Sequence, residues 1–203
     1  MEDERKKMWN DLMDVWDNVN VSCHLYFAKL YTDKFPNEAA GWIALADVLS
    51  GMARYSEARD ALRRAKFLSP KERYYFVFHQ FGHLYMEKGD YLRAEKWYRK
   101  ALEKKETTSH FIFLGACLAK QGKFSEAKKC HKKALKIASE TPDEAYYNLG
   151  LILRAEEKFE EALNYFEKAI KLNPEYKLAK EAKRDIKNLL QYKKKAKSRL
   201  KLV

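Results

Sequence analysis

Small residues recur in a fixed register through the middle of the chain, and this repetition limits the fold more than any other feature. Four of them end an apolar run, at successive spacings of 36, 33 and 35 residues: Ala46, Gly82, Gly115 and Gly150. An alanine follows each after 12 residues and another after 7 more: Ala58, Ala94, Ala127 and Ala162, then Ala65, Ala101, Ala134 and Ala169. A period of this length indicates a stack of similar units.

Large apolar residues keep the same register. The positions four before, one before, three after and nine after each small residue are apolar or aromatic, beginning with Trp42, Leu45, Leu49 and Tyr55 in the first unit. Each unit therefore has two apolar stripes at helical spacing, separated by the short polar turns 51–54, 88–90, 121–123 and 156–158. This pattern predicts helix pairs without β-strands. One pair cannot bury its own stripe, so the pairs must stack.

These segments resemble the tetratricopeptide repeat (TPR) family. The strings WIALADVL, FHQFGHLY, FIFLGACL and YYNLGLIL are similar to its first helix, and YLRAEKWYRKALEK and FEEALNYFEKAIKLNP to its second. The resemblance covers about residues 39–174, as four repeats at about 39–74, 75–107, 108–142 and 143–176. It implies an all-α fold, a right-handed superhelix of antiparallel helix pairs (an α-solenoid). His131 stands where the family usually has a large apolar ring, and we expect it to pack between helices rather than bind a ligand.

The flanking segments extend this helical pattern. Residues 1–38 are predicted to form a helix pair that caps the N-terminal end, because apolar residues recur at helical spacing: Trp9, Leu12, Met13 and Trp16, then Cys23, Phe27 and Leu30. This pair is interpreted as a degenerate repeat, since Pro36 lies 34 residues before Pro70. Residues 175–192 are predicted to form a capping helix with a polar outer face, and residues 193–203 a basic tail.

Charge is distributed unevenly. The net charge is +12, but residues 1–70 hold 10 basic and 11 acidic residues, so the excess lies in the rest of the chain. This bias suggests nucleic acid, an acidic protein or lipid as partner, or a solvated face. No segment is apolar enough to span a membrane, and the N-terminus lacks the apolar core of a secretion signal. The three cysteines, Cys23, Cys117 and Cys130, form no metal or redox motif, so we expect a reducing, cytoplasmic setting.

The chain lacks the motifs of catalysis. It has no phosphate-binding loop, nucleophile elbow or apolar carboxylate pair, so we expect neither enzymatic activity nor a cofactor. His79 and His83 lie four residues apart on one predicted helix, a spacing that can hold a metal ion. A third ligand is missing on that face apart from Glu87. We therefore expect no metal, and interpret the two histidines as polar anchors in a binding groove.

The TPR resemblance implies a binding groove on the concave face, which the first helix of each repeat lines. The positions that face it hold several apolar and aromatic residues. The expected groove residues are Ile43, Asp47, Phe76, His79, His83, Met86, Ile112, Phe113, Tyr147, Asn148, Leu151 and Arg154. Exposed apolar side chains on a concave face usually mark a binding site, although the protein's own terminal segment is an alternative occupant.

One known TPR binding mode is excluded by residue type. TPRs that hold chaperone C-terminal tails use a Lys and Asn on one helix, an Asn on the next, and a Lys and Arg on the third. The corresponding positions here include Ile43 with Asp47 and His79 with His83, and only Asn148 matches any member of the set. We do not expect this chain to bind chaperone tails.

Two functions fit these observations. The first is a protein-interaction scaffold or adaptor, which binds a peptide or helix in the groove. The alternative is nucleic-acid binding, in particular of RNA, through the basic C-terminal half. Its candidate basic patch comprises Lys128, Lys129, Lys132, Lys133, Lys136, Lys193, Lys194, Lys195 and Lys197. Only Tyr192 accompanies the tail lysines, so the tail forms no series of stacking rings.

Overall fold

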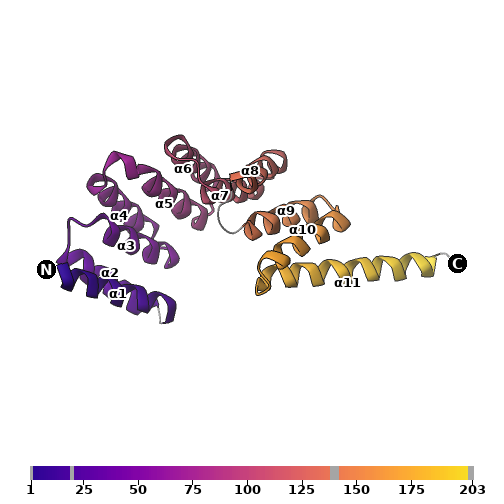
Figure 1. Ribbon diagram of the computed structural model, residues 1–203, viewed down its shortest axis with the longest axis horizontal. Coiled ribbons are helices and arrows are strands. Elements are labelled where there is room, and N and C mark those ends of the chain that lie inside the picture. Colours follow the sequence, from indigo (N-terminus) through magenta and orange to yellow (C-terminus); the bar gives the residue numbers. More distant parts are fainter. Residues whose placement is uncertain (1, 19–20, 138–141, 201–203) are drawn as a thin grey trace. The chain divides into compact units, whose positions relative to one another are not determined.

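The structure is a computed structural model, and its described residues form helices joined by turns (Figure 1). These are residues 2–18, 21–137 and 142–200, with the side chains of 15–18 and 197–200 excepted. The chain divides into two compact units, Met1–Glu106 (unit 1) and Thr107–Val203 (unit 2). No helix in the described part of the chain is both long enough and apolar enough to cross a membrane.

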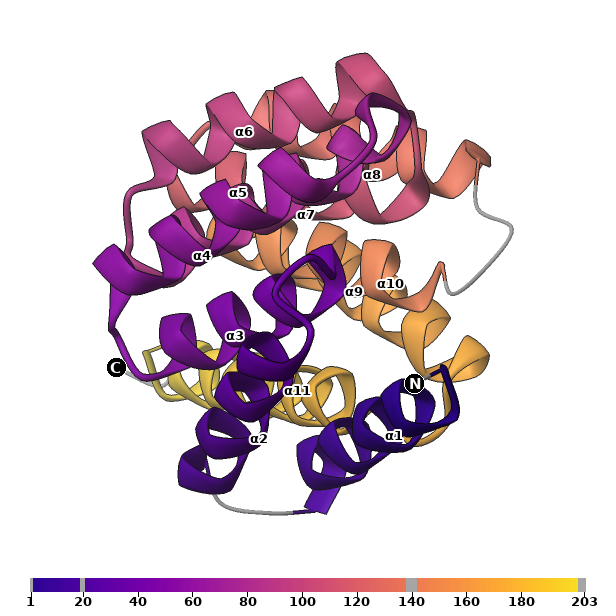
Figure 2. The ribbon, with the colours of Figure 1, turned by 90° about the vertical axis from the view of Figure 1, so that its left-hand side faces the viewer.

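Unit 1 contains three helix pairs that follow one another in space (Figure 2). The helices are α1 (Glu2–Asn18), α2 (Val21–Lys34), α3 (Ala39–Gly51), α4 (Tyr55–Leu68), α5 (Tyr74–Glu87) and α6 (Tyr91–Lys104), with the short 3-10 helix η1 (Lys71–Arg73) before α5. Each helix packs on its partner in the pair, and α3 also packs on α2, α4 and α5. The N-terminal segment thus forms two packed helices, α1 and α2, and α2 packs on α3.

Unit 2 contains two further helix pairs and a long final helix. The elements are α7 (Thr108–Lys120), α8 (Phe124–Ile137), α9 (Asp143–Ala155), α10 (Phe159–Leu172) and α11 (Lys177–Leu200). The helix α11 packs on α10 through Ala182 and Ile186 and then extends past it (Figure 1). The sequence predicted that this helix ends near Tyr192, but it continues to Leu200. The segment after Tyr192 has no Gly or Pro, and its Lys, Ala, Arg and Leu residues all favour helix.

The pairs are held together by a contact between a glycine and a ring. A Cβ atom added to Gly150 would lie 2.6 Å from the Phe166 ring, and one added to Gly115 would lie 2.7 Å from the His131 ring. Gly82 is in the same close contact with Tyr98. The absent side chain on the first helix thus makes the space that the ring on the second helix fills, which confirms the predicted role of the small residues.

The four turns inside the repeats share one backbone conformation, which the residue types alone do not predict. The residue seven after each small residue has a positive φ angle: 58° at Ala53, 76° at Gly89, 75° at Gly122 and 58° at Glu157. In each turn the next backbone N–H returns to a carbonyl five residues earlier, for example from Lys158 to Leu153 over 2.8 Å. This is the Schellman motif, which ends a helix through one left-handed residue. Only two of the four positions are glycine.

His131 packs as a core residue. Its side chain is completely buried, and neither ring nitrogen has a hydrogen-bond partner among the described residues. Burial lowers the pKa of His131 from 6.5 to about 4, because the charged ring would lose its hydration without gaining a partner. The ring is therefore neutral at pH 7 and fills the place of an aromatic side chain, as the sequence predicted.

The turn geometry predicts opposite effects of glycine and alanine. Gly122→Ala should lower the free energy of unfolding by about 1 kcal/mol, because alanine is strained at a positive φ angle. Glu157→Gly should raise it by up to about 1 kcal/mol through relief of the same strain. Gly51→Ala is the control, since Gly51 is the last residue of α3 and has open space at its Cβ position, and there alanine should be stabilising. Urea unfolding followed by circular dichroism measures all three, and a stabilising Gly122→Ala would contradict the assignment.

His131 predicts a loss of stability in acid. The folded state keeps this ring neutral while the unfolded chain binds a proton, so stability is lost as the pH falls from 6.5 towards 4. At pH 5 this group alone should cost about 2 kcal/mol relative to pH 7. His131→Phe should remove that part of the loss, and urea unfolding of both proteins at pH 7 and pH 5 measures it. Equal losses in the two proteins would show that His131 is not the group responsible.

Candidate functional site

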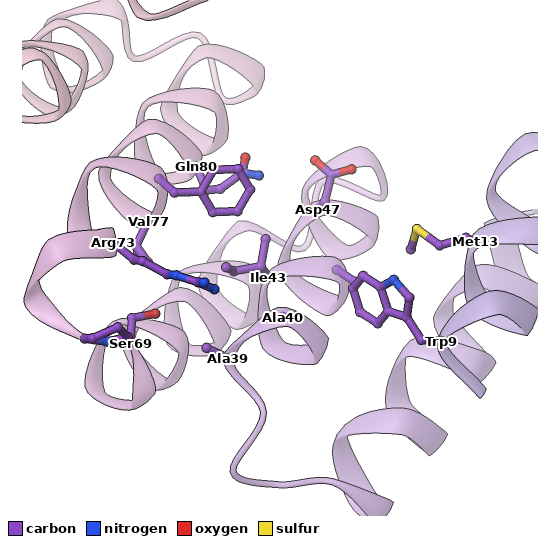
Figure 3. Close-up of a pocket in the computed structure, with 13 residues that line it drawn as sticks. Trp9, Met13, Ala39, Ala40, Ile43, Asp47, Ser69, Arg73, Val77 and Gln80 are labelled. Atoms are coloured by element: carbon purple, nitrogen blue, oxygen red, sulfur yellow. The ribbon is translucent and has the colours of Figure 1, made fainter. Parts of the chain in front are cut away.

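An apolar pocket of about 480 Å³ opens between α1, α3 and α5 of unit 1 (Figure 3). Its walls are Trp9, Met13, Ala39, Ala40, Ile43, Ala44, Asp47, Ser69, Pro70, Arg73, Phe76, Val77 and Gln80. The Phe76 side chain is 45% exposed. Exposure of a large ring to water costs free energy, and a binding partner that covers the ring would remove this cost. A concave, mostly apolar surface with a few polar groups at its edge is typical of a ligand site, and its volume is in the usual range.

The alanines of α3 make the pocket deep. Ala39, Ala40 and Ala44 form its floor together with Ile43, so small side chains face the opening where larger ones would fill it. On the α5 side, Val77 is buried and fixes the wall, while Phe76 stands at the rim. The pocket thus arises from a run of small residues on one first helix beside large ones on the next.

The third wall comes from α1, which α2 holds in place. The Trp9 ring makes an edge contact with Tyr31 of α2, with their centroids 5.3 Å apart. Tyr31 is 3% exposed and lies against Gly41 of α3, where an added Cβ would come within 2.5 Å of the ring. An ion pair of 2.6 Å between Arg5 and Glu38 also ties α1 to the start of α3. The position of Trp9 is therefore set by packing through α2.

Asp47 is the one acidic group among the described residues that line the pocket. Its side chain is 33% exposed, and its carboxylate lies 3.7 Å from Nδ1 of His83, which is too long for a hydrogen bond. Burial raises the pKa of Asp47, His83 opposes that shift, and the charge of Glu87 adds to it. The ionised carboxylate is thus poorly stabilised by its surroundings.

The structure brings three of the expected groove residues of unit 1 together. Ile43, Asp47 and Phe76 all line the pocket. Of the remaining three, His83 stands beside Asp47, while His79 makes an edge contact with Tyr98 at 5.4 Å between ring centroids. These two and Met86 lie on α5 outside the pocket wall.

The expected groove residues of unit 2 are less accessible than the sequence predicted. Ile112 is 3% exposed. Tyr147 packs on the core, 5.8 Å from Phe166 and 5.0 Å from Tyr176 between ring centroids, and Leu151 packs on the same core. Tyr147 was expected to line an open groove, but Tyr176, in the turn before α11, packs against its ring. The other three, Phe113, Asn148 and Arg154, keep partly or fully exposed side chains.

The candidate basic patch is divided among several roles. Lys128, Lys129 and Lys132 line a second pocket of about 320 Å³ with Lys158 and Tyr165. Lys128 also forms an ion pair of 2.6 Å with Glu156. Two other members lie over aromatic rings, Lys133 over Phe111 at 5.2 Å and Lys193 over Phe159 at 4.3 Å. Lys136, Lys194 and Lys195 are exposed on α8 and α11, and the side chain of Lys197 lies outside the described residues.

The N-terminal helix α1 contributes to the site, which the repeat register does not predict. Trp9 and Met13 were assigned only to a capping helix, and Arg73 and Val77 received no role. A signal was present, because Trp9 and Met13 share one face of α1 with the buried Leu12 next to it. No group of three or more His, Cys, Asp or Glu side chains within the described ranges is placed to hold a metal ion.

Both the sequence and the fold match known proteins. Residues 106–175 match the tetratricopeptide repeat family, and residues 77–107 match it separately. A TPR repeat-containing protein of Methanocaldococcus jannaschii is 28% identical over 139 residues, which cover 68% of this chain and 24% of that protein. The chain belongs to the TPR family. It spans a quarter or less of the length of the curated relatives it matches.

Solved TPR structures share this fold. The crystal structure of YrrB, described as a TPR protein with an unusual peptide-binding site, superposes with a TM-score of 0.59 at 24% identity, over 86% of this chain and 88% of that one. Yeast Tom70 superposes with a TM-score of 0.72 at 19% identity, over 89% of this chain and 38% of that one. At these identities the likeness establishes an α-solenoid of TPR helix pairs.

Proposed function

We propose that this TPR protein is a non-catalytic scaffold or adaptor that binds a short segment of a protein partner in the unit 1 pocket. The observation that supports this most is the pocket itself, which the half-exposed Phe76 and the Trp9 ring line together with the alanines of α3. Aromatic anchors around an apolar hollow are what a peptide or helix needs to bury its own apolar side chain. The proposed setting is the cytoplasm, on the sequence argument from the cysteines.

The proposal includes three groove positions of unit 2. Phe113, Asn148 and Arg154 follow the same repeat register, and their side chains remain at least partly exposed. Tyr147 and Leu151 pack on the core, so their truncation would lower stability and binding together. Substitutions that test binding in unit 2 are therefore best made at Phe113 and Asn148. Substitutions that test the proposed peptide site are best made in the unit 1 pocket.

Phe76→Ala should weaken peptide binding without unfolding the chain. Peptides selected by the full chain from a random 16-residue phage library serve as probes. Loss of an exposed aromatic anchor should weaken the selected peptides by about thirtyfold, or about 2 kcal/mol, in fluorescence anisotropy titrations. Phe67→Ala is the matched control, since Phe67 is 78% exposed on α4 and does not line the pocket. Peptides that bind Phe76→Ala and the original chain equally well would place the site elsewhere.

A second candidate function is the binding of RNA through unit 2. The pocket that Lys128, Lys129 and Lys132 line is the observation in its favour, because Lys158 and the Tyr165 ring join them there. Clustered ammonium groups beside a ring can contact a phosphate and a base. Glu156 and Glu161 lie at the same place and oppose an anion, which is why this function ranks second.

Salt dependence separates the two functions. If three phosphates are contacted, the affinity for a single-stranded RNA probe should fall about twentyfold between 50 and 200 mM salt. The double variant Lys129→Ala, Lys132→Ala should reduce both the affinity and this slope. Lys171→Ala with Lys177→Ala is the control, since these exposed lysines of unit 2 lie outside the pocket. Absence of RNA binding at 50 mM salt would remove the second candidate and leave the first intact.

A further inference from the structure

The unit 1 pocket has two ends of opposite charge. The helices α3 and α5 pack together and run in the same direction, because Asp47 near the end of α3 lies beside His83 near the end of α5. Ala39 at the start of α3 and Arg73 just before α5 both line the pocket, while Asp47 and Gln80 lie further along the two helices (Figure 3). Helix N-termini carry partial positive charge and C-termini partial negative charge. Arg73 and Asp47 therefore strengthen the field that the helix ends already create.

The Asp47 carboxylate lacks a hydrogen-bonded cation among the described side chains. No side chain in the described part of the chain donates a hydrogen bond to it, and its nearest basic group, Nδ1 of His83, stays 3.7 Å away. Glu87 lies 4.0 Å from the other ring nitrogen of His83 and adds negative charge at the same end. A carboxylate that has lost water without gaining a donor is costly to keep ionised. A ligand ammonium or guanidinium group would supply the missing interaction.

Arg73, at the other end of the pocket, lacks a carboxylate partner among the described residues. Its side chain is exposed at the edge of the pocket, on the side of Ser69, and no carboxylate among the described residues pairs with it (Figure 3). An arginine can bind a carboxylate through two parallel hydrogen bonds. The two charged groups are separated by the apolar stretch of Ala40, Ile43 and Phe76.

We propose that the partner segment is charge-polarised: an apolar side chain for the floor of the pocket, a Lys or Arg towards Asp47, and an Asp or Glu towards Arg73. This rests on the proposed function of the pocket. Asp47 lies seven residues after Ala40 on the α3 wall, a distance of about 10 Å at 1.5 Å per residue. A bound helix spans this length in about two turns, and an extended segment in about three residues.

The protein's own basic tail fits this pocket poorly. The side chains of residues Gln191–Val203 include six basic groups and no carboxylate, so these side chains offer a cation to Asp47 but no anion to Arg73. A partner with both signs satisfies both ends. The favoured occupant is therefore a segment of another protein rather than this chain's C-terminus.

Charge reversal tests the proposal. A random 16-residue phage library is selected separately on the full chain, on Asp47→Lys and on Arg73→Glu. The original chain should enrich peptides with a basic and an acidic residue at fixed positions around an apolar one. Asp47→Lys should change the basic position to Asp or Glu, and Arg73→Glu should change the acidic position to Lys or Arg. Asp33→Lys, which reverses an exposed acid on α2 outside the pocket, should leave the selected sequences unchanged.

Affinity measurements give the same test in numbers. In anisotropy titrations, Asp47→Lys should weaken a peptide selected on the original chain at least tenfold. Reversal of the matching charge in the peptide should restore the affinity to within threefold. Circular dichroism melting of each variant shows that it is folded before it is titrated.

The outcomes separate this inference from the proposed function. If the selected peptides depend on Phe76 but show no charge preference, or the same preference on Asp47→Lys, the pocket binds peptides and the charge-polarised segment is wrong. If no selected peptide depends on Phe76, the proposed function fails and the inference falls with it. A synthetic peptide of residues 189–203 that displaces the selected peptides would identify the protein's own tail as the occupant and overturn the proposal.

Discussion

Each repeat depends on a close contact between two helices, made by leaving out one side chain and supplying a large one opposite. Gly82, Gly115 and Gly150 leave the space, and the rings of Tyr98, His131 and Phe166 fill it with no more than trace exposure. In the first repeat the equivalent positions hold Ala46 and Leu62, which are buried in one core cluster. The larger residue on the first helix is thus accompanied by a smaller side chain on the second, which keeps the contact from overpacking.

This contact explains the rest of the architecture. Once the two helices of a pair are close, the alanines of the second helix are buried completely, as at Ala94, Ala127 and Ala162. The turn that joins them must then reverse the chain over a very short distance. The Schellman motif with one left-handed residue does so, and it is kept even at Ala53 and Glu157, where the side chain makes it costly. Helix pairs of one shape can stack repeatedly, which gives an α-solenoid.

The fold could be predicted because the same pattern of small and large residues recurs in four repeats. The register of small and large residues predicts helix pairs over residues 39–174, where the structure has α3 to α10. The helical stripe through Leu12 predicts a helix where the structure has α1. The left-handed turns at Ala53 and Glu157 could not be read locally, since neither residue favours that conformation. The end of α11 was misplaced because a lysine-rich segment without Gly or Pro suits a helix and a tail equally well.

The site was predicted in part, and the limit is physical. Register tells which way a side chain points from its own helix, and this brought Ile43, Asp47 and Phe76 to one pocket. Register does not tell what covers that side chain, so Tyr147 was expected to be open although Tyr176 lies against it. Trp9 lies outside the repeats altogether. It reaches the pocket through Tyr31 and Gly41, a pairing between neighbouring helix pairs that no single repeat shows.

Net charge is a poor guide to the partner of such a chain. The total of +12 suggests an acidic ligand, yet several of the basic residues cover aromatic rings, as Lys100 covers Trp97 at 4.6 Å and Lys168 covers Tyr165 at 5.0 Å. Those ammonium groups are partly balanced by the rings, and their stems cover apolar surface. Salt screens exposed charges beyond about 8 Å at physiological ionic strength. A ligand in the unit 1 pocket therefore responds to Asp47, Arg73 and the nearby helix ends, and the sign of the whole chain has little influence on what binds there.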